Sequence, residues 1–244
     1  MIRILRKAHT YIYLGTVFLI FILFYPFLYF FVKNPTKYYN QIVFCRKWIS
    51  VLATNLVGIR FKVEYEEKID WTKPYVLCPN HTSILDITAL TFLCKQPFSF
   101  MGKVELLKNP VTAAFFKSID IAVDRKSKIS SFKAYKKADE TLKSGKSLVI
   151  FPEGKIDDEY PPQLHEFKSG SFRLAIDNKV SILPIVIKDA WKILWDDGMK
   201  TGSRPGTIHI KILKPIHTED IKQGEFDELQ DYVYQQMRKH WTQL

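Results

Sequence analysis

The stretch Cys78-Pro-Asn-His-Thr-Ser-Ile-Leu-Asp86 follows an apolar run that extends from Pro74 to Leu77. An apolar run that gives way to polar residues is typical of a buried strand that passes into a turn and then a helix. If the strand ends near Cys78 and His81 lies in the turn, Asp86 can point back towards the imidazole. The carboxylate would keep one ring nitrogen protonated and leave the other free to accept a proton. The stretch therefore predicts a base, His81, that Asp86 orients.

The alternative interpretation gives the same two residues ordinary structural roles. His81 would be a capping or surface histidine, and Asp86 a first-turn carboxylate that the helix dipole favours. On one regular helix the two side chains would lie about 140° apart, so the catalytic interpretation requires the turn. This motif alone does not choose between the two interpretations.

Outward from this stretch, short apolar runs alternate with polar helical stretches, which is the pattern of an α/β domain. We expect a mixed, largely parallel sheet flanked by helices. The predicted strands are Arg60–Tyr65, Tyr75–Cys78, Phe98–Met101, Ile119–Val123, Ser147–Phe151, Ile182–Ile187 and Thr207–Leu213. The predicted helices are Leu85–Cys94, Val111–Lys117, Ile129–Ser144, Phe167–Asp177 and Phe226–Trp241, and Asp196–Gly206 is predicted to be a surface loop.

The N-terminal part of the chain is a candidate membrane anchor. Residues 11–32 form a run of 22 residues without a charge, and a helix of this length would measure roughly 33 Å, enough to cross a bilayer. Basic residues flank the run on both sides and Pro26 can kink it, so it can either cross the membrane or dip into one leaflet. A following amphipathic helix, Ile42–Ile59, is expected at the interface. We predict an anchor over residues 1–57 and an α/β domain over residues 58–244.

Composition limits the classes of partner. The chain has 244 residues, 47% of them apolar, and 36 Lys and Arg against 25 Asp and Glu, a net charge of +11. A large core is expected, together with a polyanionic partner such as nucleic acid, an anionic bilayer or a phosphorylated substrate. Nucleic acid is not expected, because the aromatic residues lie mostly in apolar segments and not among the basic ones.

Cysteine and histidine usage argues against cross-links and metals. The three cysteines, Cys45, Cys78 and Cys94, form no close pair, so neither a disulfide framework nor a zinc site is predicted and the domain is expected in reducing cytosol. The remaining histidines show no ligand spacing, so no metal is expected.

A second candidate site segment runs from Ser147 to Gly154, an apolar strand that ends in Phe151, Pro152, Glu153 and Gly154. Ligand sites in open α/β sheets gather at the carboxyl ends of strands, where the His81 segment is also expected. Glu153 can order substrate hydroxyls or basic side chains, whereas the alternative is a simple turn broken by Pro and Gly.

A third segment ends in Arg125, which Lys126 and Lys128 follow, and Lys103 lies at another strand end. A guanidinium beside ammonium groups can bind a phosphate through charge-assisted hydrogen bonds. The alternative is a solvated basic loop, which is common for a charge cluster of this size.

Taken together, the segments resemble the glycerolipid acyltransferases typified by 1-acylglycerol-3-phosphate acyltransferase. The resemblance covers roughly Val63 to Leu213 and rests on four blocks in the same order as in that family. The blocks are Asn80-His81 with Asp86 after four intervening residues, a block that ends in Arg125, Phe151 to Gly154, and Leu183-Pro-Ile-Val-Ile187. In this chain Lys155-Ile-Asp157 stands where the family usually continues Thr-Arg-Ser, so an arginine that would help to hold a phosphate is absent, and Lys155 is its candidate substitute.

The resemblance implies transfer of an acyl group from acyl-CoA or acyl carrier protein to a lysophospholipid. With 1-acylglycerol-3-phosphate as the acceptor, the product would be phosphatidic acid. His81 would be the general base, oriented by Asp86, and no metal or cofactor other than the acyl co-substrate is implied. The implied substrate-binding residues are Asn80, Lys103, Arg125, Phe151, Pro152, Glu153, Gly154 and Lys155.

With lipid substrates and cysteines that favour reducing cytosol, the active domain is expected at the cytoplasmic face of a membrane; the mechanism requires no enzymic nucleophile. The chain accordingly has no Gly-x-Ser-x-Gly motif. Backbone N–H groups near Gly154 or after Asn80 are the candidate donors to the oxyanion. Two alternatives remain: a membrane-associated lipid hydrolase in which His81 activates water, and a non-enzymatic lipid-binding protein.

Overall fold

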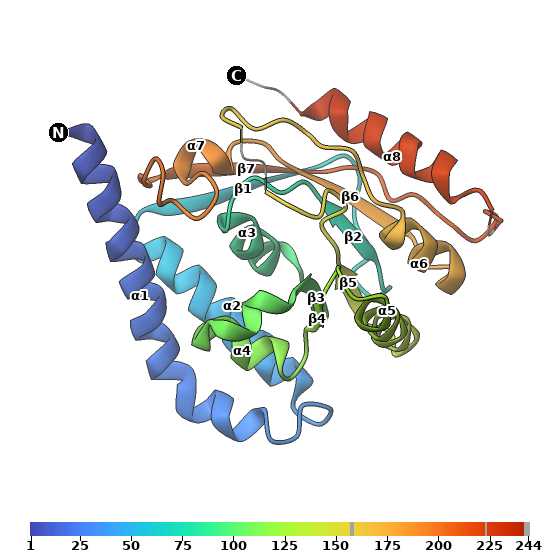
Figure 1. Ribbon diagram of the computed structural model, residues 1–244, viewed down its shortest axis with the longest axis horizontal. Helices are drawn as coiled ribbons and strands as arrows, with labels where there is room; N and C mark the ends of the chain where they lie inside the picture. The colour runs from blue at the N-terminus through green and yellow to red at the C-terminus, as the bar shows by residue number, and fades with distance from the viewer. Residues whose placement is uncertain (157–158, 223, 242–244) are drawn as a thin grey trace.

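A seven-stranded sheet forms the centre of the molecule (Figure 1). The computed structural model describes residues 1–156, 159–222 and 224–241. The strand order is β1-β7-β6-β2-β5-β3-β4, and each neighbouring pair is parallel except β6 with β7. The strands are β1 (Ile59–Tyr65), β2 (Val76–Pro79), β3 (Phe98–Lys103), β4 (Ile121–Val123), β5 (Ser147–Val149), β6 (Ile182–Ile187) and β7 (Gly206–Ile212). The predicted mixed, largely parallel sheet is confirmed.

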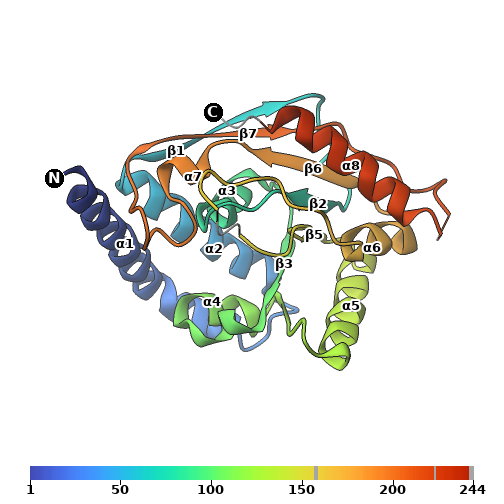
Figure 2. The same ribbon diagram turned by 45° about the horizontal axis from the view of Figure 1, so that its top comes forward.

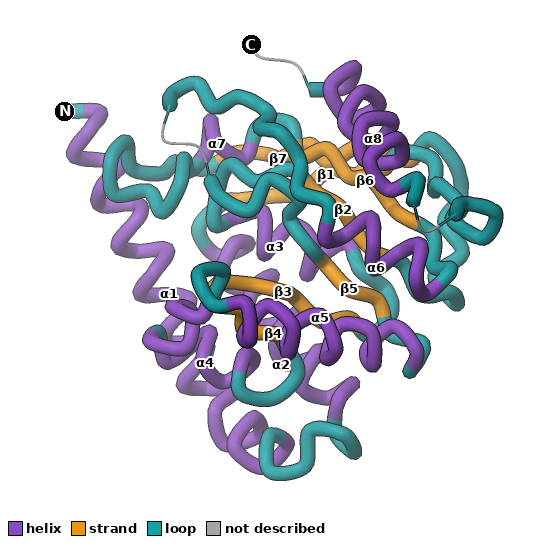
Figure 3. The backbone as a smooth tube through the Cα atoms, turned by 45° about the vertical axis from the view of Figure 1, so that its right-hand side comes forward, coloured by secondary structure: helices purple, strands orange, loops and turns teal. Residues whose placement is uncertain are grey.

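Helices cover both faces of this sheet (Figures 2 and 3). On one face, α2 and α3 pack against the strands, with α1 and α4 outside them; α5, α6 and α8 pack on the other face. The helices are α1 (Ile2–Phe31), α2 (Tyr39–Leu56), α3 (Leu85–Leu93), α4 (Pro110–Phe116), α5 (Lys128–Lys143), α6 (Gly170–Asn178), α7 (Ala190–Ile193) and α8 (Phe226–His240), with a 3-10 turn, η1 (Val104–Lys108). This three-layer order is the usual way to bury both faces of a parallel sheet.

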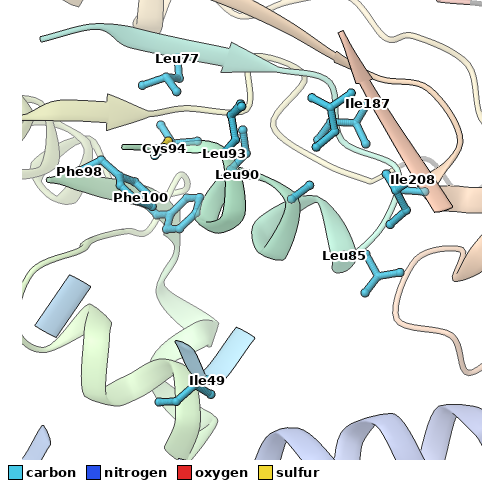
Figure 4. Packing of buried hydrophobic residues seen from close by; sticks show 14 of the residues in the cluster. Ile49, Leu77, Leu85, Leu90, Leu93, Cys94, Phe98, Phe100, Ile187 and Ile208 are labelled. Carbon is cyan, nitrogen blue, oxygen red and sulfur yellow. The ribbon is translucent and has the colours of Figure 1, made fainter. Parts of the chain in front are cut away.

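Helix α3 is enclosed by apolar side chains. Leu85 and Leu90 are fully buried in one apolar cluster with Leu77 of β2 and Ile187 of β6, and Figure 4 shows side chains of this cluster around α3. Because close-packed interiors leave a helix little freedom to shift, this packing fixes the first turn of α3 relative to the ends of β2 and β6. Asp86 lies in that first turn.

Helix α1 lies along the domain instead of standing apart from it. It extends nine residues further towards the N-terminus than the uncharged run, and its buried residues, from Thr10 to Leu28, form one stripe. The backbone N–H of Ser203 donates to the carbonyl of Arg6 at 3.0 Å. Gly202 has a φ of +75°, and a Cβ there would lie 2.6 Å from the Arg6 carbonyl carbon, so this close approach requires glycine. The predicted loop over Asp196–Gly206 is confirmed, and α1 covers the part of it around Gly202 and Ser203.

The start of α6 differs from the prediction, and two short elements were not expected. Helix α6 begins at Gly170 and not at Phe167, because the backbone N–H of Lys168 donates to the carbonyl of Pro152 at 2.9 Å and this loop contact replaces a helical turn. The short elements η1 and α7 were not predicted, because five and four residues are too few to show a helical period.

Helix α2 carries a buried ion pair that fastens the N-terminal helices to the sheet. Arg46 Nη1 donates to Asp120 Oδ1 at 2.7 Å, Nη2 donates to the Phe98 carbonyl at 2.8 Å, and the guanidinium lies over the Phe98 ring. Asp120 Oδ1 also accepts from the backbone N–H of Phe100 at 2.9 Å. Arg46 is thus a buried structural residue. The hydrophobic core continues across residue 57 from α2 into β1 and α3.

We predict that Arg46→Ala destabilises the fold strongly, because it leaves the Asp120 carboxylate buried without its cation. The expected loss in the free energy of unfolding is about 3–5 kcal/mol. Urea denaturation of the full chain in detergent measures it. Lys143→Ala is the matched control, since it removes an exposed ion pair with Asp139 and should cost no more than about 0.5 kcal/mol. Equal losses in the two variants would contradict the structural role of Arg46.

Candidate active site

Four parallel strands bring the candidate residues to one edge of the sheet. Strands β2, β5, β3 and β4 are consecutive neighbours, so their carboxyl ends all face the same way. Leu77 of β2 pairs with Val149 of β5, which places the loop that begins at Asn80 beside the loop that begins at Ile150. This edge is where ligand sites of open α/β sheets form.

The structure brings His81 and Asp86 into direct contact. The distance from His81 Nδ1 to Asp86 Oδ2 is 3.0 Å, and the carboxylate side chain is fully buried whereas the imidazole is 17% exposed. Nε2 makes no hydrogen bond with any residue that the structure describes. An imidazole with one nitrogen held by a buried carboxylate and the other uncommitted is arranged to accept a proton. The catalytic role of both residues stays a prediction.

The local fold keeps the Asp86 carboxylate in this position. Oδ2 also accepts hydrogen bonds from the backbone N–H groups of Thr82, at 2.6 Å, and Ser83, at 2.8 Å. Both N–H groups belong to the turn that precedes α3, so a carboxylate in the first turn of the helix can reach back and accept from them. The same oxygen therefore ties the turn and the imidazole together.

Glu153 and Phe151 hold the His81 loop from the neighbouring strand. Glu153 is 3% exposed; its Oε1 accepts from the backbone N–H of His81 at 2.7 Å and its Oε2 accepts from the N–H of His165 at 2.9 Å. The Phe151 ring stacks on the imidazole with 3.9 Å between ring centroids. These contacts give the Phe-Pro-Glu-Gly block a positioning role, while contact of Phe151, Pro152 and Glu153 with a substrate stays a prediction.

The Asn80 side chain forms hydrogen bonds with the backbone of β6. Its Nδ2 donates to the carbonyl of Ile187 at 3.1 Å, and its Oδ1 accepts from the Ile187 N–H at 2.7 Å. The side chain is 1% exposed. Its amide continues the pairing of β2 with β6 beyond the last strand residue, while the predicted contact of Asn80 with a substrate stays a prediction.

The candidate oxyanion donors of these loops are already engaged. The N–H groups of residues 81 to 83 donate to the two carboxylates, and the N–H of Gly154 donates to the Phe151 carbonyl at 3.1 Å. These four N–H groups are therefore committed inside the protein.

Basic side chains converge beside Gly154. Arg125 Nη1 donates to the carbonyl of Gly154, and a Cβ at Gly154 would lie 2.9 Å from that nitrogen and 3.0 Å from Lys168 Nζ. Lys168 makes no hydrogen bond or ion pair through Nζ with the residues that the structure describes. Two cations that approach one glycine form an arrangement suited to an anion.

Partial burial lowers the pKa of the Arg125 guanidinium from its ordinary value, and Glu105 opposes this shift. At neutral pH arginine remains charged, because its ordinary pKa is far above 7. Lys168 was missed in the sequence because its approach to Arg125 depends on the loop contact between Lys168 and Pro152. Lys103 and Lys155 are exposed, at the end of β3 and directly after Gly154. Asp157, the last residue of the divergent Lys155-Ile-Asp segment, lies outside the described residues.

The cysteines are unsuited to nucleophilic catalysis. All three are buried and free, and burial raises the pKa of the Cys78 and Cys94 thiols to about 12. Only a vanishing fraction of either would be thiolate near neutral pH, and the thiolate is the reactive form. No group of three or more His, Cys, Asp or Glu side chains that could hold a metal ion occurs among the described residues.

Comparisons with known proteins identify the family of the chain. Residues 60–188 match the family model described as Acyltransferase. An uncharacterized acyltransferase of Schizosaccharomyces pombe is 32% identical over 73% of this chain and 64% of its own length. The 1-acyl-sn-glycerol-3-phosphate acyltransferase of Saccharomyces cerevisiae is 30% identical over 75% of this chain and 60% of its own length. The matched segment thus spans less than two thirds of these relatives.

The fold also has a counterpart of known structure. The crystal structure of the 1-acyl-sn-glycerophosphate acyltransferase from Thermotoga maritima superposes with a TM-score of 0.80 and 20% sequence identity, and the match covers 100% of both chains. At this identity the likeness concerns the fold, including the arrangement of helices around the mixed sheet.

Proposed function

The chain belongs to the acyltransferase family, and we propose that it transfers an acyl group from a thioester to the free hydroxyl of a lysophospholipid. The proposed acceptor is 1-acylglycerol-3-phosphate and the product phosphatidic acid, because relatives from yeast and mouse carry that substrate in their names. The single observation that carries the proposal is the His81–Asp86 contact at the carboxyl edge of the sheet. The acyl donor is either acyl-CoA or acyl carrier protein.

The chemistry follows from the free nitrogen of His81. A glycerol hydroxyl is a poor nucleophile at neutral pH, so Nε2 accepts its proton as the oxygen attacks the thioester carbonyl. The imidazolium that forms is stabilised by Asp86. The tetrahedral intermediate then collapses, the carbon–sulfur bond breaks, and the proton on His81 passes to the departing thiolate. An ester and a free thiol result, and no residue of the protein becomes acylated.

The basic residues beside Gly154 are the proposed binding site for the phosphate of the acceptor. Arg125 and Lys168 place two cations beside Gly154, at the same edge of the sheet as the His81 loop. They supply the charge that the missing arginine after the Phe-Pro-Glu-Gly block would provide, and Lys103 and Lys155 are further candidates. A phosphomonoester carries up to two negative charges, which favours a site with several cations.

We further propose that α1 attaches the protein to a membrane and lies within one leaflet. This helix is apolar and long enough to span a bilayer, with a mean hydropathy of 2.2 in its most apolar window, and 17% of that window is buried. Its buried stripe runs from Thr10 to Leu28, a length of roughly 27 Å that is close to the thickness of the hydrocarbon core. A perpendicular span would draw the packed domain into the hydrocarbon. The active domain would face the cytoplasm.

We predict that His81→Ala lowers kcat/KM for acyl transfer about 10²–10⁴-fold, the usual contribution of a general base. His209→Ala is a matched control, because His209 contacts Asp189 through Nδ1 at 2.6 Å but its side chain is 47% exposed on β7. The assay measures acylation of lysophosphatidic acid, with acyl-CoA and with acylated acyl carrier protein as donors. Near-wild-type activity of the His81 variant would refute the proposal, and free fatty acid without acylated acceptor would indicate a hydrolase instead.

We predict that the double variant Arg125→Ala and Lys168→Ala raises KM for lysophosphatidic acid about 10- to 100-fold, because charge-assisted hydrogen bonds to the phosphate are lost. The KM for monoacylglycerol, which has no phosphate, should stay unchanged. Lys214→Ala, an exposed lysine beside Glu67, is the control for net charge. A similar rise in KM with both acceptors would show that the two cations do not recognise the phosphate.

A further inference from the structure

The first turns of α5 expose two large apolar side chains. Ile129 is 70% exposed and Phe132 is 71% exposed. Among the described residues that follow Val57, no other large apolar side chain is as exposed. They are three positions apart, so they lie on the same side of the helix. The opposite side of α5 is the one that packs on the sheet, through Ala134, Ala138 and Leu142. Neither exposed residue therefore contributes to the core.

Lysines flank these two side chains along the sequence. From Arg125 to Ala138 the sequence contains six cations and no carboxylate. Lys126, Lys128, Lys133 and Lys136 are all exposed, and none of them forms an ion pair with a residue in the described part of the chain. We call Ile129, Phe132 and these four lysines the α5 face.

An anionic bilayer fits this combination better than a soluble acidic partner. Apolar side chains enter the boundary between head groups and acyl chains, while lysine ammonium groups remain at the level of the phosphates. Each lysine near an anionic surface adds to the attraction. An acidic protein would satisfy the lysines but gives no reason for two bulky apolar side chains at their centre.

The position of the α5 face also suits a bilayer. In Figure 2 the N-terminal end of α5, helix α4 and the C-terminal part of α1 all lie towards the lower edge of the view. Ile129 follows Arg125 by four residues, and Arg125 contacts Gly154 at the candidate active site. A bilayer seated on the α5 face would bring lipid head groups to the edge of the sheet where His81 lies.

We propose that the α5 face is a second membrane contact, separate from α1, that inserts Ile129 and Phe132 into an anionic lipid surface. Together with α1 it would define the tilt of the domain on the membrane. The inference rests on exposure and charge, and it stands apart from the proposed catalytic activity.

The test places an environment-sensitive fluorophore on the full chain at Ile129→Cys. The three native cysteines are buried, so labelling is directed to the new thiol. Bound to vesicles of phosphatidylcholine with phosphatidylglycerol, the label should shift to the blue and be quenched by lipids with a nitroxide on the acyl chain. Added salt should weaken the effect, because it screens the lysines. The same label at Tyr232→Cys, an exposed position on α8, is the control and should remain in water.

The outcomes separate this inference from its rivals. A label at residue 129 that stays in water on anionic vesicles overturns the proposal. If the label leaves water as the protein concentration rises without lipid, the α5 face binds a second copy of the chain. If the label leaves water only when acidic acyl carrier protein is added, the face is a docking surface for the donor. Either result also overturns the proposal. The fluorescence measurement tests the membrane contact even if the chain shows no acyl transfer activity.

An activity measurement adds a second, independent readout. Ile129→Ser with Phe132→Ser should lower the rate with a long-chain acceptor embedded in anionic vesicles about tenfold, since apolar burial at the interface is lost. The rate with a water-soluble short-chain acceptor should remain at the wild-type level. An equal loss of rate with both acceptors would show that the two substitutions disturb the fold and not the contact with the membrane.

Discussion

The Asp86 carboxylate is the group around which the candidate site is organised. One of its oxygens accepts from the His81 ring and from the N–H groups of Thr82 and Ser83, while Glu153 accepts the N–H of His81. Two buried carboxylates thereby hold three consecutive N–H groups of one loop. A loop held in this way cannot rotate the imidazole without breaking several hydrogen bonds. Such preorganisation would reduce the entropy cost of using His81 as a base, as the proposed mechanism requires.

The rest of the fold holds these two carboxylates in fixed positions relative to each other. Glu153 comes from the end of β5 and Asp86 from the first turn of α3, which packs among apolar side chains from β2 and β6. Arg46 and Asp120 fasten α2 to β3 and β4 inside the protein. Because α2 also packs against α1, helix α1 is coupled to the sheet and thus to the orientation of the site. An anchor on a flexible linker would leave that orientation free.

Much of the architecture was predictable from periodicity. All seven strands were expected close to their observed positions, because each is a short apolar run bounded by turn residues. The contact of His81 with Asp86 was also accessible, since five residues and one turn determine it. Sequence did not predict what depends on distant segments. Arg46 meets Asp120 across 74 residues, Lys168 reaches Gly154 only through the Pro152 loop, and the engagement of Asn80 with Ile187 depends on the strand order.

The central claim is that Asp86 keeps the proton on Nδ1 of His81 and leaves Nε2 unprotonated. Nitrogen-15 NMR of the full chain with labelled histidine measures this directly, with the His81 signals assigned by their loss in a His81→Gln variant. The account predicts that the neutral ring is the Nδ1–H tautomer, with a pyridine-like shift for Nε2. A neutral ring that carries its proton on Nε2 would contradict it, because the nitrogen facing the substrate could then accept no proton.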